Sequence, residues 1–173
     1  GTVGFPLPMT AVRIVDEAGT DVADGVSGEL LVRGPNVCAG YWRRPDATAA
    51  AFQDGWFRTG DVGVRAADGY ITLEGRRSDL IISGGFNIYP PEVADALMSH
   101  PSVASAAVIG IPDDKWGEAV KAVCVPKPGA QIDPESVIGW ARERIAGFKV
   151  PRSVDIIAAL PRNASGKILR KDL

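Results

Sequence analysis

The spacing of apolar residues along the chain changes character near Gly75. Before that residue, apolar and polar positions alternate over short runs such as AVRIVD, GELLVRG and GYITLEG, separated by Gly, Pro and Asp-Gly pairs. This alternation, with frequent turn residues, is typical of short antiparallel strands joined by hairpins. We therefore predict a small antiparallel β-barrel-like subdomain over residues 1–75.

A short helix is expected to interrupt this β subdomain. Residues 47–52 read ATAAAF and follow Pro45 and Asp46. A carboxylate just before a helix accepts hydrogen bonds from its first free N–H groups, so Asp46 is predicted as the N-cap.

After Gly75 the spacing predicts the order helix, strand, strand, helix, strand. The Pro90-Pro91 pair suits entry into a helix in which Val93 and Leu97 share a face, and Pro101 follows its end. The next strands are SVASAAVIGI and EAVKAVCV, and SVDIIAAL is the last.

The second helix is expected from Pro134 to Ala146, with apolar residues spaced by four. We expect both helices to close over the strands near Val108, Val123 and Ile156. The fold class is therefore α+β, a small β-barrel-like subdomain followed by a small α+β C-terminal domain over residues 76–173.

Composition excludes several classes of protein. The 173 residues are 46% hydrophobic and 23% charged, as in ordinary globular domains. A net charge of -2 gives no electrostatic footprint for nucleic acid, and no apolar run approaches the roughly 18 residues of a membrane span. Cys38 and Cys124 lack metal-site spacing and no export signal opens the chain, so we expect a cytoplasmic, reducing compartment and no metal site.

The glycine pair in GRRSDLIISGGFNIYPPEVADAL has two interpretations. Glycines before a helix often bind phosphate through backbone N–H groups. However, Gly84 and Gly85 are followed by Phe86 and Asn87, without the third glycine of a dinucleotide site or the lysine of a P-loop. A tight turn, in which glycine supplies unusual φ values, is favoured.

Three residues suggest chemistry with a nucleotide, and each has a plainer alternative. Asp61 in GWFRTGD could accept two hydrogen bonds from a ribose diol, or could be an ordinary turn aspartate. Arg76 could bind phosphate or ribose oxygens, or could pair with a surface carboxylate. Lys167, on a Ser-Gly turn, could pair with a phosphate, or could belong to a solvated basic tail.

Taken together, these stretches resemble the adenylate-forming superfamily, which includes acyl-CoA synthetases, peptide-synthetase adenylation domains and luciferases. The resemblance rests on GWFRTGDVG, GRRSDLIISGGFNIYPPEVA, DDKWGEAV, GFKVPR and LPRNASGKILR, in the family's order and over essentially the whole chain. It implies a two-step ligase that uses ATP, Mg2+ and coenzyme A. A carboxylate attacks the α-phosphate of ATP, and a thiol then displaces AMP, while the small C-terminal domain rotates between the two half-reactions.

For the first half-reaction, the resemblance implies roles at four positions. Asp61 looks like the ribose-binding aspartate, Arg76 like the arginine that contacts ribose or phosphate, and Leu73 like a residue lining the nucleotide. Lys167 looks like the catalytic adenylation lysine, whose charge offsets negative charge developing on the α-phosphate.

For the second half-reaction, the resemblance places the Gly84-Gly85 loop beside the pantetheine channel, where a missing side chain lets a thin substrate pass. Trp116, Phe148 and Arg152 match positions near coenzyme A. Trp116 could stack on the adenine or be a partly exposed packing residue, and Arg152 could pair with a phosphate of coenzyme A. Ser78 stands where the family's hinge residue is commonly Asp or Lys.

The chain departs from the family mainly by lacking upstream motifs. The phosphate loop, the Tyr-Gly-x-Thr-Glu stretch for nucleotide and magnesium, and the acyl pocket are missing. We therefore expect a fragment, with residues 1–75 as the last β subdomain of a large N-terminal domain and residues 76–173 as the mobile C-terminal domain. The fragment alone is expected to be inactive, and its β subdomain to promote a homodimer.

Three functions remain open, and the first is favoured. The first is an AMP-forming acyl-CoA ligase acting on a small carboxylic acid, ATP and coenzyme A. The second is an adenylation domain that loads a carrier protein. The third is an isolated nucleotide-binding or interaction module.

Overall fold

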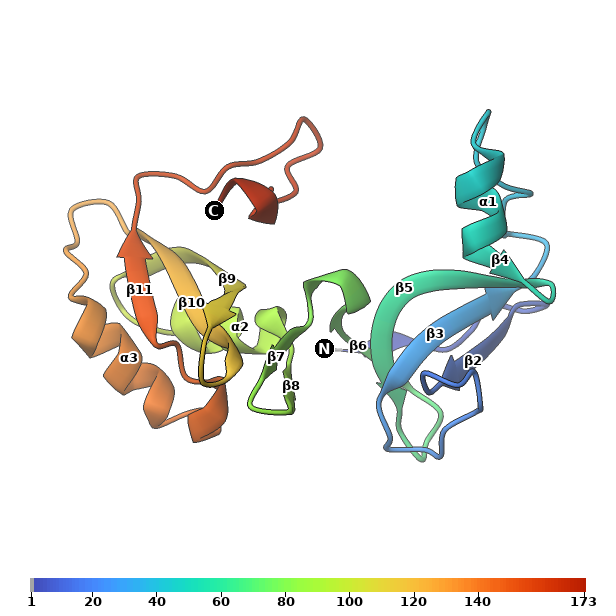
Figure 1. The fold of residues 1–173 in the computed structure, drawn as a ribbon, viewed down its shortest axis with the longest axis horizontal. Coiled ribbons are helices and arrows are strands. Elements are labelled where there is room, and N and C mark those ends of the chain that lie inside the picture. The colour runs from blue at the N-terminus through green and yellow to red at the C-terminus, as the bar shows by residue number, and fades with distance from the viewer. Residues whose placement is uncertain (1) are drawn as a thin grey trace. The chain divides into compact units, whose positions relative to one another are not determined.

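The computed structural model of the protein describes residues 2–173, which separate into two units, Gly1–Ser78 and Asp79–Leu173 (Figure 1). Each unit has its own sheet and its own apolar core. The α+β class predicted from the apolar spacing is confirmed.

The first unit is built on an antiparallel sheet in the order β1-β6-β5-β3-β2, with β4 added beside β5. The three strands predicted from alternation are confirmed as β2, β3 and β6. Among the pairings of residues 2–78 none joins β1 to β2, so the sheet is open rather than a closed barrel. The strands are β1 Thr2–Gly4, β2 Ala11–Val15, β3 Gly28–Arg33, β4 Phe52–Gln53, β5 Trp56–Arg65 and β6 Ile71–Arg76.

The short helix α1 spans Pro45–Ala51 and begins two residues earlier than an Asp46 cap requires. Its N-cap is Arg44, which makes no side-chain cap hydrogen bond. Asp46 instead lies in the first turn and pairs with Arg44, Nη2 to Oδ2 at 3.0 Å. The predicted cap is wrong because Pro45, which has no N–H and a fixed φ, suits the first helical position.

The central strand β5 is not predicted by the apolar spacing. The Thr-Gly pair that reads as a turn lies inside it, where Gly60 has a φ of +71°. Glu29 of β3 pairs with Val62, whereas Leu31 pairs with Arg58, so the register shifts between these partners. The turn is therefore a β-bulge, which lets the strand continue while re-aiming nearby side chains.

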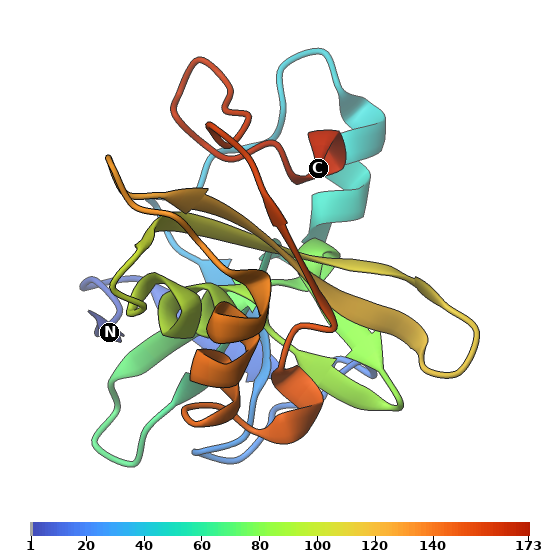
Figure 2. The ribbon, with the colours of Figure 1, turned by 90° about the vertical axis from the view of Figure 1, so that its left-hand side faces the viewer.

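The second unit has a mixed sheet, β11-β10-β7-β8 with β9 beside β10, in which only the β10–β11 pairing is parallel. Figure 2 shows the long β9–β10 hairpin that dominates this sheet. The predicted order of two helices and three strands is confirmed, and the β7–β8 hairpin is added to it. The elements are β7 Ile81–Ser83, β8 Phe86–Ile88, α2 Pro90–Met98, β9 Val103–Asp113, β10 Gly117–Pro126, α3 Pro134–Arg142 and β11 Ser153–Ile156.

Helices α2 and α3 bury their apolar faces, including Val93, Leu97, Val137 and Ala141, against one face of this sheet. Helix α3 stops at Arg142 instead of the predicted Ala146, because the Arg144 N–H bonds to the Ala141 oxygen three residues back, at 2.9 Å, which tightens and ends the last turn.

The sheet residues predicted beneath the helices are only partly right. Val108 is buried there, but Ile156 is 41% exposed. Val123 lies on the opposite face, because its neighbour Ala122 already points toward the helices and successive strand residues alternate.

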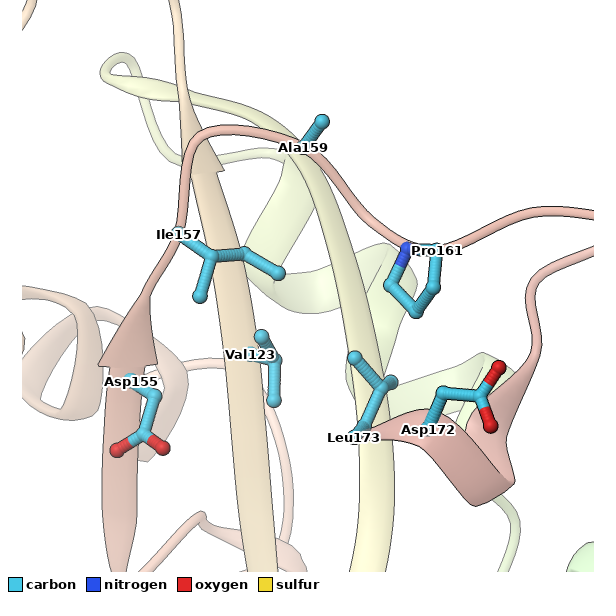
Figure 3. A pocket seen from close by; sticks show the side chains of 7 residues that line it. All are labelled: Val123, Asp155, Ile157, Ala159, Pro161, Asp172 and Leu173. Atoms are coloured by element: carbon cyan, nitrogen blue, oxygen red, sulfur yellow. The ribbon is translucent and has the colours of Figure 1, made fainter.

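The opposite face of the sheet is covered by the C-terminal segment. Ala107 and Val123 form a small apolar cluster with Leu160, against which Ile168 and Leu173 pack. A hollow of about 360 Å³ remains between sheet and segment (Figure 3). The stretch around Lys167 is therefore attached to the sheet at both ends.

Candidate functional site

Asp61 and Arg76 face each other across the β5–β6 pairing. The Arg76 Nε lies 2.8 Å from the Asp61 Oδ1, and its Nη1 donates to the backbone oxygen of Thr59 at 2.9 Å. The Asp61 side chain is 28% exposed and that of Arg76 is 53% exposed. Both charges are thus fixed in direction yet open to a ligand. The carboxylate that Arg76 pairs with is Asp61 itself.

Leu73 lies on the same strand as Arg76, and its side chain is 41% exposed. The register shifts here as well, since Val62 pairs with Gly75 but Gly63 pairs with Leu73. The extra residue on β6 offsets the usual alternation, and Leu73 and Arg76 are both exposed. An apolar and a charged side chain are therefore both exposed near the end of β6.

Lys167 lies on a closed hairpin organised by Asn163. The Asn163 Oδ1 accepts hydrogen bonds from the Lys167 N–H at 2.9 Å, the Ser165 N–H at 3.0 Å and the Ser165 hydroxyl at 2.8 Å. Gly166 has a φ of +82°, and its carbonyl accepts from Arg162 Nη1 at 2.7 Å. The backbone of Lys167 is thus held in place while its side chain is exposed. This geometry disfavours a loose basic tail.

Gly84 and Gly85 form the two-residue turn between β7 and β8, with φ values of +58° and +83°. Positive φ at both positions is the geometry of a tight hairpin, which confirms the turn interpretation. A Cβ on Gly84 would lie 2.8 Å from the Trp116 ring, whereas a Cβ on Gly85 would meet no atom within 4 Å. Gly84 is therefore required by a close neighbour, and Gly85 by its backbone conformation alone.

Trp116 joins this hairpin to two cationic side chains. Its backbone oxygen accepts from the Gly84 N–H at 2.8 Å, and its side chain is 38% exposed. Lys115 Nζ lies 4.7 Å and Arg152 Cζ 5.7 Å from the ring centroid. Trp116 both packs on glycine and presents a surface, and Lys115 was not identified from the sequence.

Phe148 also contacts the β7–β8 hairpin. It belongs to the 3₁₀ turn Gly147–Lys149, and its ring stacks on Phe86 of β8 with centroids 4.5 Å apart. The neighbouring Lys149 contacts both carboxylate oxygens of Glu92 at 2.6 Å. The structure thus brings together, around the β7–β8 hairpin, the residues predicted to lie near coenzyme A: Gly84, Gly85, Trp116, Phe148 and Arg152.

Ser78 is the last residue of the first unit, and its two neighbours are each ion-paired within their own unit. Arg77 Nη1 lies 2.8 Å from Glu29 Oε2, and Asp79 Oδ2 lies 2.6 Å from Arg170 Nη1. Neither pair is predicted by the sequence. The only available signal was the position of Arg77 and Asp79 beside the expected hinge.

Glu29 is a buried carboxylate, only 7% exposed, that pairs with Arg58 as well as with Arg77. Burial alone would raise its pKa. The hydrogen bonds and positive charges of Arg58 and Arg77 outweigh burial, so the pKa of Glu29 is lowered. The carboxylate therefore stays ionised within the sheet.

Among residues 2–173, no group of three or more His, Cys, Asp and Glu side chains is placed to hold a metal ion. Within the same range, no helix is long and apolar enough to cross a membrane. Both cysteines are free thiols. Cys38 is exposed, whereas burial raises the pKa of Cys124 to about 11.

Comparison with known proteins gives consistent matches to both units. Residues 1–42 match the family of AMP-binding enzymes, and residues 92–167 match the AMP-binding enzyme C-terminal domain. The chain is 49% identical over 173 residues to a feruloyl-CoA synthase from Amycolatopsis sp, covering 100% of this chain and 35% of that relative.

Solved structures agree with these matches. The o-succinylbenzoate CoA synthetase of Bacillus subtilis, in complex with the acyl-adenylate OSB-AMP, superposes with a TM-score of 0.94 at 42% identity, over 99% of this chain and 35% of that one. ATP-bound MatB from Rhodopseudomonas palustris gives 0.92 at 41% identity, with the same coverage. The chain thus spans about a third of the length of these relatives. It belongs to the adenylate-forming family of AMP-binding enzymes, and its residues 92–167 match the C-terminal domain of that family.

Proposed function

We propose that this chain is part of an ATP-dependent ligase that converts a carboxylic acid first into an acyl-adenylate and then into an acyl-CoA thioester. The main supporting observation is the Asn163-organised hairpin, which fixes the backbone of Lys167 and leaves its ammonium group exposed. An exposed cation on a fixed backbone suits a phosphate on which negative charge increases during the reaction. Similar proteins named as CoA synthases support the same chemistry.

In the first half-reaction, a carboxylate oxygen of the acid bonds to the α-phosphorus of ATP and pyrophosphate leaves. Lys167 offsets the negative charge that develops on the α-phosphate oxygens. The Asp61 carboxylate accepts hydrogen bonds from the ribose hydroxyls, and Arg76 orients that carboxylate and contacts ribose or phosphate oxygens. Leu73 packs against the nucleoside. We expect the magnesium ion that accompanies ATP to be bound mainly by the remainder of the protein.

In the second half-reaction, the thiol sulfur of coenzyme A bonds to the carbonyl carbon of the adenylate, AMP leaves, and the thiol proton passes to solvent. The Gly84-Gly85 turn borders the pantetheine arm, since a Cβ on Gly85 would project into open space. Trp116 stacks on the adenine of coenzyme A, and Arg152 pairs with a phosphate of coenzyme A. Phe148, stacked on Phe86, supports the same surface.

We assign Ser78 as the hinge between these half-reactions and residues 76–173 as the mobile domain. The Glu29–Arg77 pair ties the residue before Ser78 to the first unit, and the Asp79–Arg170 pair ties the residue after it to the second. Rotation is then concentrated at one residue, as in other hinges where few backbone angles absorb the motion. A charged hinge side chain is not needed for this.

The test uses the full-length protein with ATP, magnesium, coenzyme A and a panel of carboxylic acids. We expect acid-dependent pyrophosphate release, followed by thioester formation with coenzyme A. Thioester formation only on a phosphopantetheinylated carrier protein would favour the carrier-loading alternative. Absence of pyrophosphate release with every acid, together with binding of AMP or coenzyme A in calorimetry, would favour a binding module.

A homodimer through the first unit is a further part of the proposal. Val3, Phe5, Leu7 and Met9 are each more than half exposed near its N-terminus. Clustered apolar residues favour association. Sedimentation of the 173-residue chain at increasing concentration tests this, and a constant monomer mass would contradict it.

A further inference from the structure

An ion pair connects the segment that carries Lys167 to the start of the second unit. Arg170 lies three residues after Lys167 and begins the short 3₁₀ turn Arg170–Asp172. Its Nη1 lies 2.6 Å from the Oδ2 of Asp79, the first residue of the unit, although 91 positions separate the two in sequence.

This ion pair is partly removed from solvent. The side chain of Asp79 is 24% exposed and that of Arg170 is 36% exposed. The Arg170 Nε is fully buried and, among the described residues, has no hydrogen-bond partner. Because a partly desolvated guanidinium is costly without an opposite charge, the Asp79 carboxylate is the group that stabilises Arg170 in this position.

The base of the Lys167 hairpin lies directly beside this pair. The Leu169 N–H donates to the Pro161 oxygen at 2.9 Å and closes the hairpin one residue before Arg170. Ile168 packs on the apolar cluster of the sheet. This non-directional contact keeps the hairpin against the sheet but does not fix its position along the sheet surface. The ion pair adds a directional contact at the same end of the hairpin.

We propose that Asp79 and Arg170 are positioning residues for Lys167. Their ion pair couples the position of the Lys167 hairpin to that of Asp79, the first residue after the proposed hinge at Ser78. This proposal rests on the adenylation role of Lys167 proposed above. Neither residue touches substrate. Their effect is to fix where the ammonium group is delivered, and a displacement of about 1 Å at a reacting centre costs up to 100-fold in rate.

Kinetic tests separate this role from a merely structural one. In the full-length protein, Asp79→Asn and Arg170→Gln should each slow acid-dependent pyrophosphate release by about 10- to 100-fold. Thioester formation from supplied acyl-adenylate should stay within about twofold, since Lys167 acts only in the first half-reaction. The exchanged double variant Asp79→Arg with Arg170→Asp should recover part of the loss.

Arg144→Gln is the matched control, because it makes the same change at another ion-paired arginine of the second unit. It should leave both half-reactions within about twofold of the unmodified protein. If Lys167→Ala abolishes adenylation while both pair variants keep their rates, the positioning role is wrong. Equal loss in both half-reactions would also overturn it, because it would indicate a folding defect.

Hydrogen exchange of the 173-residue chain gives a readout that does not depend on the assigned reaction. In Asp79→Asn and in the milder Arg170→Lys, the amides of Lys167 and Leu169 should exchange faster, while amides of β9 and β10 keep their protection. Unchanged exchange at the hairpin would contradict the proposal. If the hairpin loosens but Lys167→Ala leaves adenylation intact, the ion pair positions the hairpin and the role assigned to Lys167 fails.

Discussion

At the scale of single residues, the position of a charge decides which step it can affect. Lys167 is exposed, whereas its backbone is fixed by Asn163 through a 2.9 Å hydrogen bond. A fixed backbone with a free ammonium group limits the conformations lost when the lysine meets a phosphate. The expected contribution is therefore to transition-state charge rather than to folding.

We predict that Lys167→Ala lowers the rate of adenylation in the full-length protein by about 100-fold or more, which corresponds to roughly 3 kcal/mol of transition-state stabilisation. Thioester formation from supplied acyl-adenylate should change little, because in the proposed mechanism the lysine contacts the phosphate only in the first half-reaction. Pyrophosphate release and thioester formation are measured separately. Equal loss in both steps would contradict the assignment, and Lys171→Ala, at an exposed lysine of the same segment, is the control.

A second residue-scale prediction concerns Glu29, whose pKa is lowered from the usual 4.5. A group with a lowered folded pKa contributes stability that is complete above its unfolded pKa and is lost as the pH falls through the folded value. Thermal stability of the first unit should therefore decline below about pH 4.5, as Glu29 becomes protonated.

Glu29→Gln should remove this part of the pH dependence and lower stability at pH 7 by about 3 kcal/mol, because Arg58 is left partly buried without its carboxylate. Both effects are measured by thermal melting curves recorded from pH 3 to pH 7 in steps of about half a pH unit. Glu17→Gln, at an exposed position, is the control and should shift the curves little. An unchanged pH profile in Glu29→Gln would exclude this carboxylate as the source.

Short motifs identify residue types well but do not identify their partners. Asp61, Arg76 and Lys167 are evident in the sequence because each lies within a distinctive local pattern. The pairing of Asp79 with Arg170 spans 91 positions, and nothing in the local sequence of either residue names the other. Ion pairs between distant segments form only after the sheet has placed both segments.

At the scale of elements, the period-two and helical patterns succeed where they are uninterrupted. Strands β2, β3 and β6 and both helices of the second unit follow from apolar spacing. The strand β5 is missed because Gly60 and the bulge beside Asp61 break its alternation. The Gly84-Gly85 turn is predicted, but the strands on either side of it are not. Strands β7 and β8 have only three residues each, which is too short to show a period-two pattern.

The β7–β8 hairpin gives an element-scale prediction. Gly85→Leu should slow thioester formation in the full-length protein by about tenfold or more while leaving pyrophosphate release largely intact. The leucine side chain would enter the open space beside the turn, where we propose that the pantetheine arm passes. Gly85→Ala is the control for backbone strain, since it imposes the same φ of +83° with a minimal side chain. Both half-reactions are followed in both variants.

If Gly85→Leu lowers adenylation as much as thioester formation, the hairpin is a folding element only. If Gly85→Ala and Gly85→Leu have equal effects, backbone strain rather than obstruction explains the loss. Only a selective effect of the larger side chain supports a channel for the thiol.

At the scale of the whole molecule, the two units differ in how completely they bury apolar residues. The second unit closes α2 and α3 over five strands, with Val93, Leu97, Val108 and Val137 each fully buried. The first unit has a smaller cluster around Ile14, Leu30 and Ile71 and a series of exposed apolar side chains. A domain with a continuous core is expected to fold independently, and the first unit has the weaker basis for it.

We predict that the 173-residue chain folds on its own but has no ligase activity. It should melt cooperatively because the apolar core of the second unit is complete without further chain. Turnover should be absent because the chain spans about a third of its relatives' length, and the residues proposed to contact ATP, namely Asp61, Arg76 and Lys167, are too few to position ATP and an acid. A pyrophosphate assay with ATP, magnesium and mixed carboxylic acids, run beside a thermal melt, tests both statements. Measurable turnover would show that these groups suffice for catalysis, and a melt without a cooperative transition would show that the core of the second unit depends on chain outside these residues.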